Sequence, residues 1–188
     1  MMGIGNLTEM SEVDSAGVNF LLAAVCQELG IHRVLTTAVI PWAKSSVREF
    51  DRSRRVVKLA VDEQRVPKHL ESELVLLRDT QLQEWGEEAV QKLAGSLTDP
   101  NYRILVERGE VHIMNRDGYW RGTDAFDLFR QFAEKNPKLT PAHAFYLGYE
   151  MAKAVTALTL GKQYRQDQAL RWGFLTVPEP ETDHSVRS

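Results

Sequence analysis

The first ten residues constrain the fold of this chain more than any other segment. Residues 3–10 read Gly-Ile-Gly-Asn-Leu-Thr-Glu-Met, which predicts a short strand over residues 3–7 that ends in polar residues and leads into an amphipathic helix. Polar side chains at the carboxyl end of a parallel strand are the usual ligand contacts of α/β folds. Because almost nothing precedes this strand, we expect the chain to be the tail of a larger βα protein.

Two βα units are expected in the N-terminal third. The first strand leads to a helix over about residues 14–29, and a second strand over residues 34–40 leads to a helix over about residues 45–63. The second strand is rich in β-branched residues, which is typical of a strand covered on both faces. The residues predicted to form the buried helix faces are Val18, Leu21, Leu22, Val25 and Leu29 in the first helix, and Val47, Phe50, Val57 and Val61 in the second.

The pattern changes after a candidate linker at residues 65–68. Residues 102–121 alternate and contain two turn signals, which predicts an antiparallel hairpin or meander. Thr140 and Pro141 predict the start of a long helix that Gly161 ends. We therefore expect an α/β chain in which two βα units (residues 1–65) precede a small α+β domain (residues 66–176) and a disordered tail (residues 177–188).

Composition excludes several classes of protein. The net charge of −3 argues against a nucleic-acid partner. The single cysteine, Cys26, excludes an internal disulfide. No apolar run reaches the ~18 residues that a membrane span needs, so we expect a cytoplasmic protein without a membrane partner.

The N-terminal pattern resembles the closing part of dihydropteroate synthase-related proteins. The resemblance rests on Gly-Asn-Leu-Thr-Glu at residues 5–9, Asp-Ser-Ala-Gly-Val-Asn at residues 14–19 and Leu-Thr-Thr at residues 35–37. It implies the last two units of a (β/α)8 pterin-binding barrel. Gly5 and Asn6 take the place of a Ser-Asn pair that contacts the pterin in the related methyltransferases, whereas the Ser-Arg-Lys tip of ordinary synthases is missing.

Three polar residues of this strand tip are therefore expected to bind a pterin: Asn6, Thr8 and Glu9. The amide of Asn6 both donates and accepts, which suits the alternating edge of a pterin ring. Thr8 adds a hydroxyl group, and Glu9 could accept from an exocyclic amine. The alternative is that these side chains only satisfy backbone groups of a turn.

A second candidate site follows the next strand. Lys44, Ser45 and Ser46 stand at the start of a helix, where free N–H groups, hydroxyls and a cation form an anion site. Barrel enzymes often bind phosphate on the loops after their last strands. The alternative is an N-cap serine beside a surface lysine.

The C-terminal half resembles a small domain of unknown function that is appended to archaeal-type dihydropteroate synthase-related proteins. The resemblance rests on residues 143–154 and 161–167, covers about residues 100–172, and brings no established activity. Four polar residues fall within about 80° of one another on the helix predicted before Gly161: His143, Tyr146, Glu150 and Lys153. A hydrogen-bonded pocket wall or proton-transfer site is one interpretation, and a helix ion pair beside a core histidine is the other. The candidate residues of this half are His143, Tyr146, Glu150, Lys153, Tyr164 and Asp167.

Both resemblances imply the C-terminal portion of a pterin-binding protein of folate or tetrahydromethanopterin biosynthesis. The implied reaction is a synthase-like transfer that joins a dihydropterin diphosphate to an arylamine. We expect the pterin as substrate or ligand, no tightly bound cofactor, no metal, and little activity of this chain alone. The alternatives are a pterin- or corrinoid-linked methyl-transfer component and a non-catalytic assembly module. Exposed strand edges predict a homo-oligomer or a complex with the missing N-terminal barrel portion.

Overall fold

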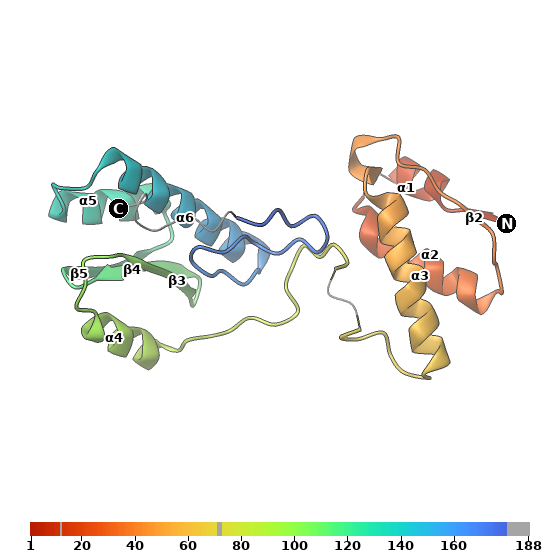
Figure 1. The fold of residues 1–188 in the computed structure, drawn as a ribbon, viewed down its shortest axis with the longest axis horizontal. Helices are drawn as coiled ribbons and strands as arrows, with labels where there is room; N and C mark the ends of the chain where they lie inside the picture. Colours follow the sequence, from red (N-terminus) through yellow and green to blue (C-terminus); the bar gives the residue numbers. More distant parts are fainter. Residues whose placement is uncertain (12, 71–72, 180–188) are drawn as a thin grey trace. The chain divides into compact units, whose positions relative to one another are not determined.

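The computed structural model describes residues 1–11, 13–70 and 73–179, and the chain divides into two compact units (Figure 1). The N-terminal unit comprises Met1–Leu76 together with the short segment Trp172–Leu175. The C-terminal unit comprises Leu77–Arg171 and the chain from Thr176 onward. Most of the predicted disordered tail, residues 180–188, lies outside the described residues.

The N-terminal unit contains a minimal parallel sheet. Its strands are β1 (Met2–Gly3) and β2 (Val34–Leu35), which pair Met2 with Val34 and Gly3 with Leu35. The helical elements of the unit are α1 (Gly5–Ser11), α2 (Ser15–Glu28), the 3-10 turn η1 (Pro41–Ala43) and α3 (Ser46–Asp62). Two strands of two residues do not confirm the predicted resemblance to the end of a (β/α)8 barrel.

The strand predicted over residues 3–7 is wrong beyond Gly3, because the chain turns into α1. Gly5 lies against the backbone of the residues that follow β2, where an added Cβ atom would be 2.9 Å from the Thr37 nitrogen. The first helical turn closes at once, since Leu7 N–H donates to the Ile4 carbonyl and the Thr8 hydroxyl donates to the Gly5 carbonyl. The second strand also ends early, at Leu35, because β1 offers only two residues to pair with.

Helices α2 and α3 pack against each other and against the small sheet. The apolar core of the unit contains Ile4, Leu22, Ala23, Phe50 and Val57. Each large apolar side chain buried here contributes about 1.5–3 kcal/mol. The predicted buried faces are therefore only partly right: Leu21, Val25 and Leu29 of α2 and Val47 and Val61 of α3 are exposed.

The C-terminal unit is built on an antiparallel sheet, as predicted. Strands β3 (Arg103–Glu107), β4 (Glu110–Asn115) and β5 (Gly118–Gly122) form a meander in the order β3-β4-β5. The β3–β4 hairpin turns through Arg108 and Gly109, both with positive φ, as two-residue hairpin loops require.

Helices cover both faces of this sheet. Helix α4 (Glu87–Ser96) packs Val90 against Leu105 and Met114, whereas α5 (Ala125–Lys135) and α6 (Pro141–Leu160) lie on the other side (Figure 1). The predicted ends of α6 are confirmed, since the Thr140 hydroxyl accepts from His143 N–H and Gly161 ends the helix with φ of +70°. Among the described residues, no helix is both long and apolar enough to cross a membrane.

Candidate functional site

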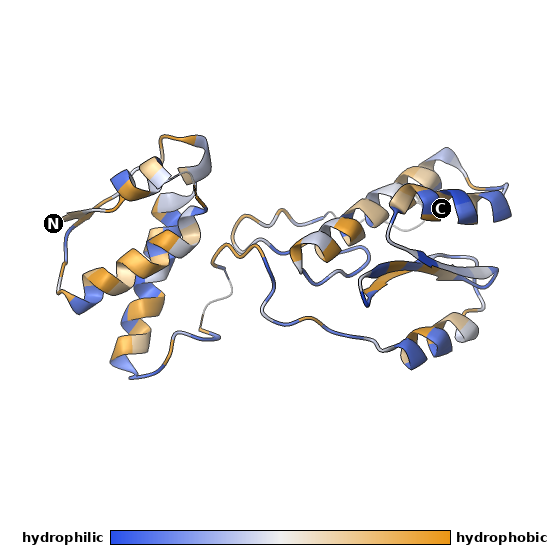
Figure 2. Ribbon diagram, turned by 180° about the vertical axis from the view of Figure 1, so that it is seen from behind, coloured by the Kyte–Doolittle hydropathy of each residue, from blue (hydrophilic) through white to orange (hydrophobic). Residues whose placement is uncertain are grey.

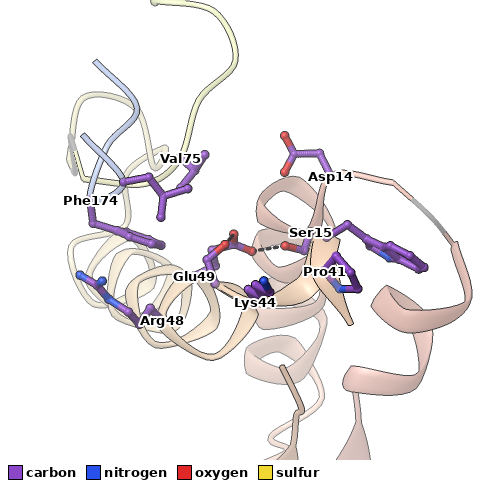
Figure 3. Close-up of a pocket in the computed structure, with 11 residues that line it drawn as sticks. Asp14, Ser15, Pro41, Lys44, Arg48, Glu49, Val75 and Phe174 are labelled. Carbon is purple, nitrogen blue, oxygen red and sulfur yellow. Dashed lines mark hydrogen bonds between the residues drawn. The ribbon is translucent and has the colours of Figure 1, made fainter. Parts of the chain in front are cut away.

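The N-terminal unit contains a pocket of about 400 Å³ where the starts of α2 and α3 meet. Figure 3 shows Phe174 and Arg48 on one side of this pocket, Asp14, Ser15 and Pro41 on the other, and Glu49 between them. Lining residues come from the start of α2, from η1 through the start of α3, and from two extended segments. They are Asp14, Ser15, Pro41, Trp42, Lys44, Ser45, Arg48, Glu49, Val75, Phe174 and Leu175.

The floor of the pocket is a buried polar cluster centred on Glu49. Its carboxylate accepts from the hydroxyls of Ser15 and Ser45 at 2.5 and 2.6 Å and from the Asn19 amide at 3.0 Å. The same amide nitrogen donates to the hydroxyl and carbonyl of Ser46 at 3.0 and 3.2 Å. A buried carboxyl group is tolerated only when such donors replace water. The cluster therefore fixes the starts of α2 and α3 relative to each other.

Two cations line the pocket without a carboxylate partner among the described residues. Lys44 follows η1 and is exposed, and no ion pair involves it in this part of the chain. Arg48 lies on the first turn of α3 with its guanidinium carbon 4.4 Å from the centre of the Phe174 ring. Asp14 caps α2 by accepting from Ala16 N–H, so its carboxylate is directed at the helix start. The pocket thus combines two cations with the carboxylates of Asp14 and Glu49.

Aromatic rings supply the walls. The Trp42 indole is held by a 3.0 Å hydrogen bond from Nε1 to the Thr8 carbonyl. Phe174 is held by its N–H, which donates to the Glu73 carbonyl at 2.8 Å. Sequence reasoning missed Phe174 and Leu175, because they lie more than 110 residues beyond the end of α3 and no local pattern links them to it.

The predicted anion-binding residues fall at this pocket. Lys44 and Ser45 line it, and Ser46 lies just beneath, bonded to Asn19. These three residues are brought together as expected, and their role in binding stays a prediction.

The predicted pterin-binding residues lie elsewhere, and their predicted place at a strand tip is wrong. Asn6, Thr8 and Glu9 stand on α1, and none of them lines the pocket. Asn6 is exposed, Thr8 is buried with its hydroxyl on the Gly5 carbonyl, and Glu9 accepts from the Thr37 hydroxyl. The link from α1 to the pocket is the bond between the Thr8 carbonyl and Trp42.

The six candidates of the C-terminal unit lie in two hydrogen-bonded groups and one set of aromatic contacts, and of the six Glu150, Lys153 and Tyr164 are buried. Glu150 pairs with Lys153 at 2.7 Å and accepts from the Tyr164 hydroxyl at 2.7 Å. The Tyr146 hydroxyl donates to Asp167 at 2.9 Å and accepts from the Gln166 amide at 2.7 Å. The His143 ring meets the rings of Tyr102 and Tyr146 edge-on.

Electrostatics fix the protonation states of these groups. Burial, followed by the charge of Glu150, raises the pKa of Tyr164 far above its usual value, and burial likewise raises the pKa of Tyr146. Burial alone lowers the pKa of His143. Burial also acts to lower the pKa of Lys153, but Glu150 and Glu179 outweigh it and the pKa rises. At neutral pH both tyrosines are therefore neutral donors and Lys153 is charged. No group of three or more potential metal ligands gathers within the described ranges.

A family model matches much of the C-terminal unit. Residues 89–167 match the model of the PterinBD-DUF4346 family, whose description combines a pterin-binding domain with a domain of unknown function. This match confirms the resemblance predicted for the C-terminal half.

One curated relative matches over most of the chain. It is the uncharacterized protein MJ0107 of Methanocaldococcus jannaschii, which is 28% identical over 185 residues; the match covers 88% of this chain and 35% of the relative. The chain therefore spans about a third of the length of the relative it matches. No solved structure matches.

Proposed function

We propose that this chain is the C-terminal portion of a dihydropteroate synthase-like, pterin-binding protein, and that the pocket of the N-terminal unit receives a dihydropterin diphosphate. The observation that carries the proposal is the pair of cations without carboxylate partners, Lys44 and Arg48, in a pocket walled by Trp42 and Phe174. The family match of the C-terminal unit supports a pterin as the ligand class.

The pocket offers complementary groups to both halves of such a ligand. Lys44 and Arg48 would hold the diphosphate, since charge-assisted hydrogen bonds of this kind are each worth about 1.5–3 kcal/mol. The rings of Trp42 and Phe174 would pack on the flat pterin, and the Asp14 carboxylate would accept from its exocyclic amine. The volume of about 400 Å³ is within the range of small-molecule sites.

The reaction that this arrangement suits is a displacement of diphosphate. An arylamine nitrogen would form a bond to the methylene carbon of the pterin while the carbon–oxygen bond to diphosphate breaks and the amine loses a proton. Lys44 and Arg48 would stabilise the charge that develops on the leaving group, and the aromatic walls would position the ring. The product class would be an intermediate of folate or tetrahydromethanopterin biosynthesis. Turnover would require further polypeptide, because the chain spans only about a third of its relative.

The test is a titration of the full chain with 6-hydroxymethyl-dihydropterin diphosphate, followed by the change in tryptophan fluorescence. We expect saturable binding that Lys44→Ala weakens about tenfold, the equivalent of ~1.4 kcal/mol. Lys58→Ala is the matched control, because Lys58 lies on α3 outside the pocket and pairs with Asp62. Equal affinities of Lys44→Ala and wild type would contradict the diphosphate site.

Two further comparisons separate the alternatives. Binding of unphosphorylated 6-hydroxymethylpterin as tight as that of the diphosphate would favour the methyl-transfer component, which has no use for a diphosphate site. Weakening by Asn6→Ala instead of Lys44→Ala would move the pterin site to α1. Absence of binding by either ligand would favour the non-catalytic assembly module.

A further inference from the structure

The two serine hydroxyls at the floor of the pocket donate their protons within the protein. Ser15 and Ser45 line the pocket, and each donates to the Glu49 carboxylate, at 2.5 and 2.6 Å; Figure 3 shows the bond from Ser15. An ionised carboxylate only accepts, and a serine hydroxyl has a single proton to donate. The direction of both bonds is therefore fixed, and each serine oxygen keeps only its lone pairs for a further contact.

Ser45 does not use its hydroxyl as a helix cap. It occupies the N-cap position of α3, but its side chain makes no capping hydrogen bond. The hydroxyl proton is directed instead at Glu49, four residues later. While it points there, the hydroxyl is available neither to cap α3 nor to donate to a bound anion.

The rest of the polar cluster also leaves acceptors over. The Asn19 amide nitrogen donates to Ser46 and to Glu49, whereas Asn19 Oδ1 is buried and receives no hydrogen bond within the described part of the chain. Ser15 is buried, whereas Ser45 is half-buried. The oxygen of Ser45 is thus the acceptor of this cluster that a ligand in the pocket reaches most readily.

This polarity divides the pocket into two parts. Lys44 and Arg48 attract an anion, but the lone pairs of Ser45, with the charge of Glu49 behind them, oppose one. A hydroxyl that donates to a carboxylate is polarised and becomes a better acceptor. The start of α3 therefore suits an N–H group of a ligand beside the place where the cations suit its phosphates.

We propose that Ser45 is a specificity-determining residue of the pocket: its oxygen, oriented by Glu49, accepts an N–H group of the ligand's ring and does not bind the diphosphate. The proposal rests on the function proposed above, and it assigns the ring and the diphosphate of that ligand to different side chains. A ligand with a lone pair in place of this N–H group is rejected, because two acceptors would then face each other.

Calorimetric titration of the full chain with two ligands tests this assignment. Inorganic diphosphate has only the anionic part, and 6-hydroxymethyl-dihydropterin diphosphate has both parts. Ser45→Ala is expected to weaken binding of the pterin ligand about tenfold and to leave binding of inorganic diphosphate unchanged. Lys44→Ala is the matched comparison and should weaken both ligands, whereas Ser45→Thr keeps the hydroxyl and should bind both as wild type does. Equal losses of the two ligands in Ser45→Ala, or loss of neither, overturn the proposal.

Glu49→Gln provides a second test, because it reverses the polarity of Ser45. Oε2 of Glu49 receives two donors, from Ser15 and Asn19, so the glutamine oxygen takes that place and its amide nitrogen faces Ser45. The Ser45 oxygen then accepts from this nitrogen, and its proton is free to reach an anion. Inorganic diphosphate should bind several-fold tighter to Glu49→Gln, and adding Ser45→Ala should remove part of that increase. An increase of the same size with and without Ser45 would come from the lost charge alone and would contradict the reversal.

The outcomes for wild type and for the variants separate this proposal from the proposed function. Absence of binding of both ligands by wild type removes the diphosphate site and the function with it. Binding of both ligands by wild type, with equal losses in Ser45→Ala, leaves the function in place and removes only the role assigned to Ser45.

Discussion

At the scale of single residues, Glu49 organises the candidate site without being its most accessible group. Its carboxylate takes three donors from α2 and from the start of α3, and it is 2% exposed. That leaves Lys44, Arg48 and Asp14 as the charged groups that can meet a ligand. A carboxylate that is saturated by protein donors can support a site, whereas a cation without a carboxylate partner is available to a ligand.

The pH dependence of stability should carry the signature of His143. Because burial lowers its pKa in the folded state, the unfolded chain binds more protons in the window below the ordinary pKa of about 6.5. The contribution of neutral His143 to the free energy of unfolding is then fully present above that pKa. It falls as the pH drops through the window toward the pKa of the folded state. Urea unfolding between pH 7 and pH 5 should therefore show a steeper loss for wild type than for His143→Gln. An equal change in the free energy of unfolding with pH for the two proteins would contradict this assignment.

What could be predicted of the site residues follows from how local their signals are. Lys44 and Ser45 were predictable, because a lysine and hydroxyls before a helix are a local pattern. The sequence predicts the wrong place for Asn6 and Thr8, because the same residue types suit a strand tip or a helix start. The close approach of Gly5 to Thr37 favours the helix. Tertiary contacts of this kind have no trace in the local sequence.

At the scale of elements, the segment of Gly173 is the most sensitive to a small change. Gly173 has φ of +61°, and any Cβ would overlap the backbone of Glu73 and Leu74, which cannot move aside as a flexible side chain would. Gly173→Ala should therefore lift the segment and destabilise the chain by about 1–3 kcal/mol. Urea unfolding measures the loss of stability.

A second glycine is the matched control for this prediction. Gly17 lies within α2, and an added Cβ there meets nothing within 4 Å. Gly17→Ala should stabilise the chain by about 0.5–1 kcal/mol through its helix propensity. Equal effects of the two substitutions would mean that the segment is not seated as described.

Helices were predictable and the parallel strands were not, for a physical reason. Capping by Asp14 and Thr140 and the αL glycine at Gly161 are local devices, and the structure has all three. The β-branched run over residues 34–40 predicts a long strand, but a strand needs a partner, and β1 pairs with only Val34 and Leu35. The antiparallel meander was predictable because its turns bring together segments that are neighbours in the sequence.

At the scale of the whole molecule, the N-terminal unit leaves apolar surface uncovered. Leu21, Val25 and Leu29 follow one another at i, i+4 and i+8 along α2 and its C-cap, and all three are exposed. Figure 2 colours much of this helix as hydrophobic. The sheet has one exposed face as well, with Leu35 at 58% exposure. Parallel sheets are normally covered on both faces, and two strands alone are marginal in water.

We therefore expect the purified chain to associate through the N-terminal unit. Contiguous apolar stripes mark contact surfaces more often than scattered apolar residues do. Sedimentation velocity should show a concentration-dependent oligomer, and Leu21→Lys with Leu29→Lys should shift it toward the monomer by placing two charges in the stripe. Leu82→Lys in the C-terminal unit, which is similarly exposed, is the control that should leave the distribution unchanged. A wild-type chain that sediments as a monomer at every concentration would show that the stripe is tolerated in water, and the uncovered sheet would then have to be stable by itself.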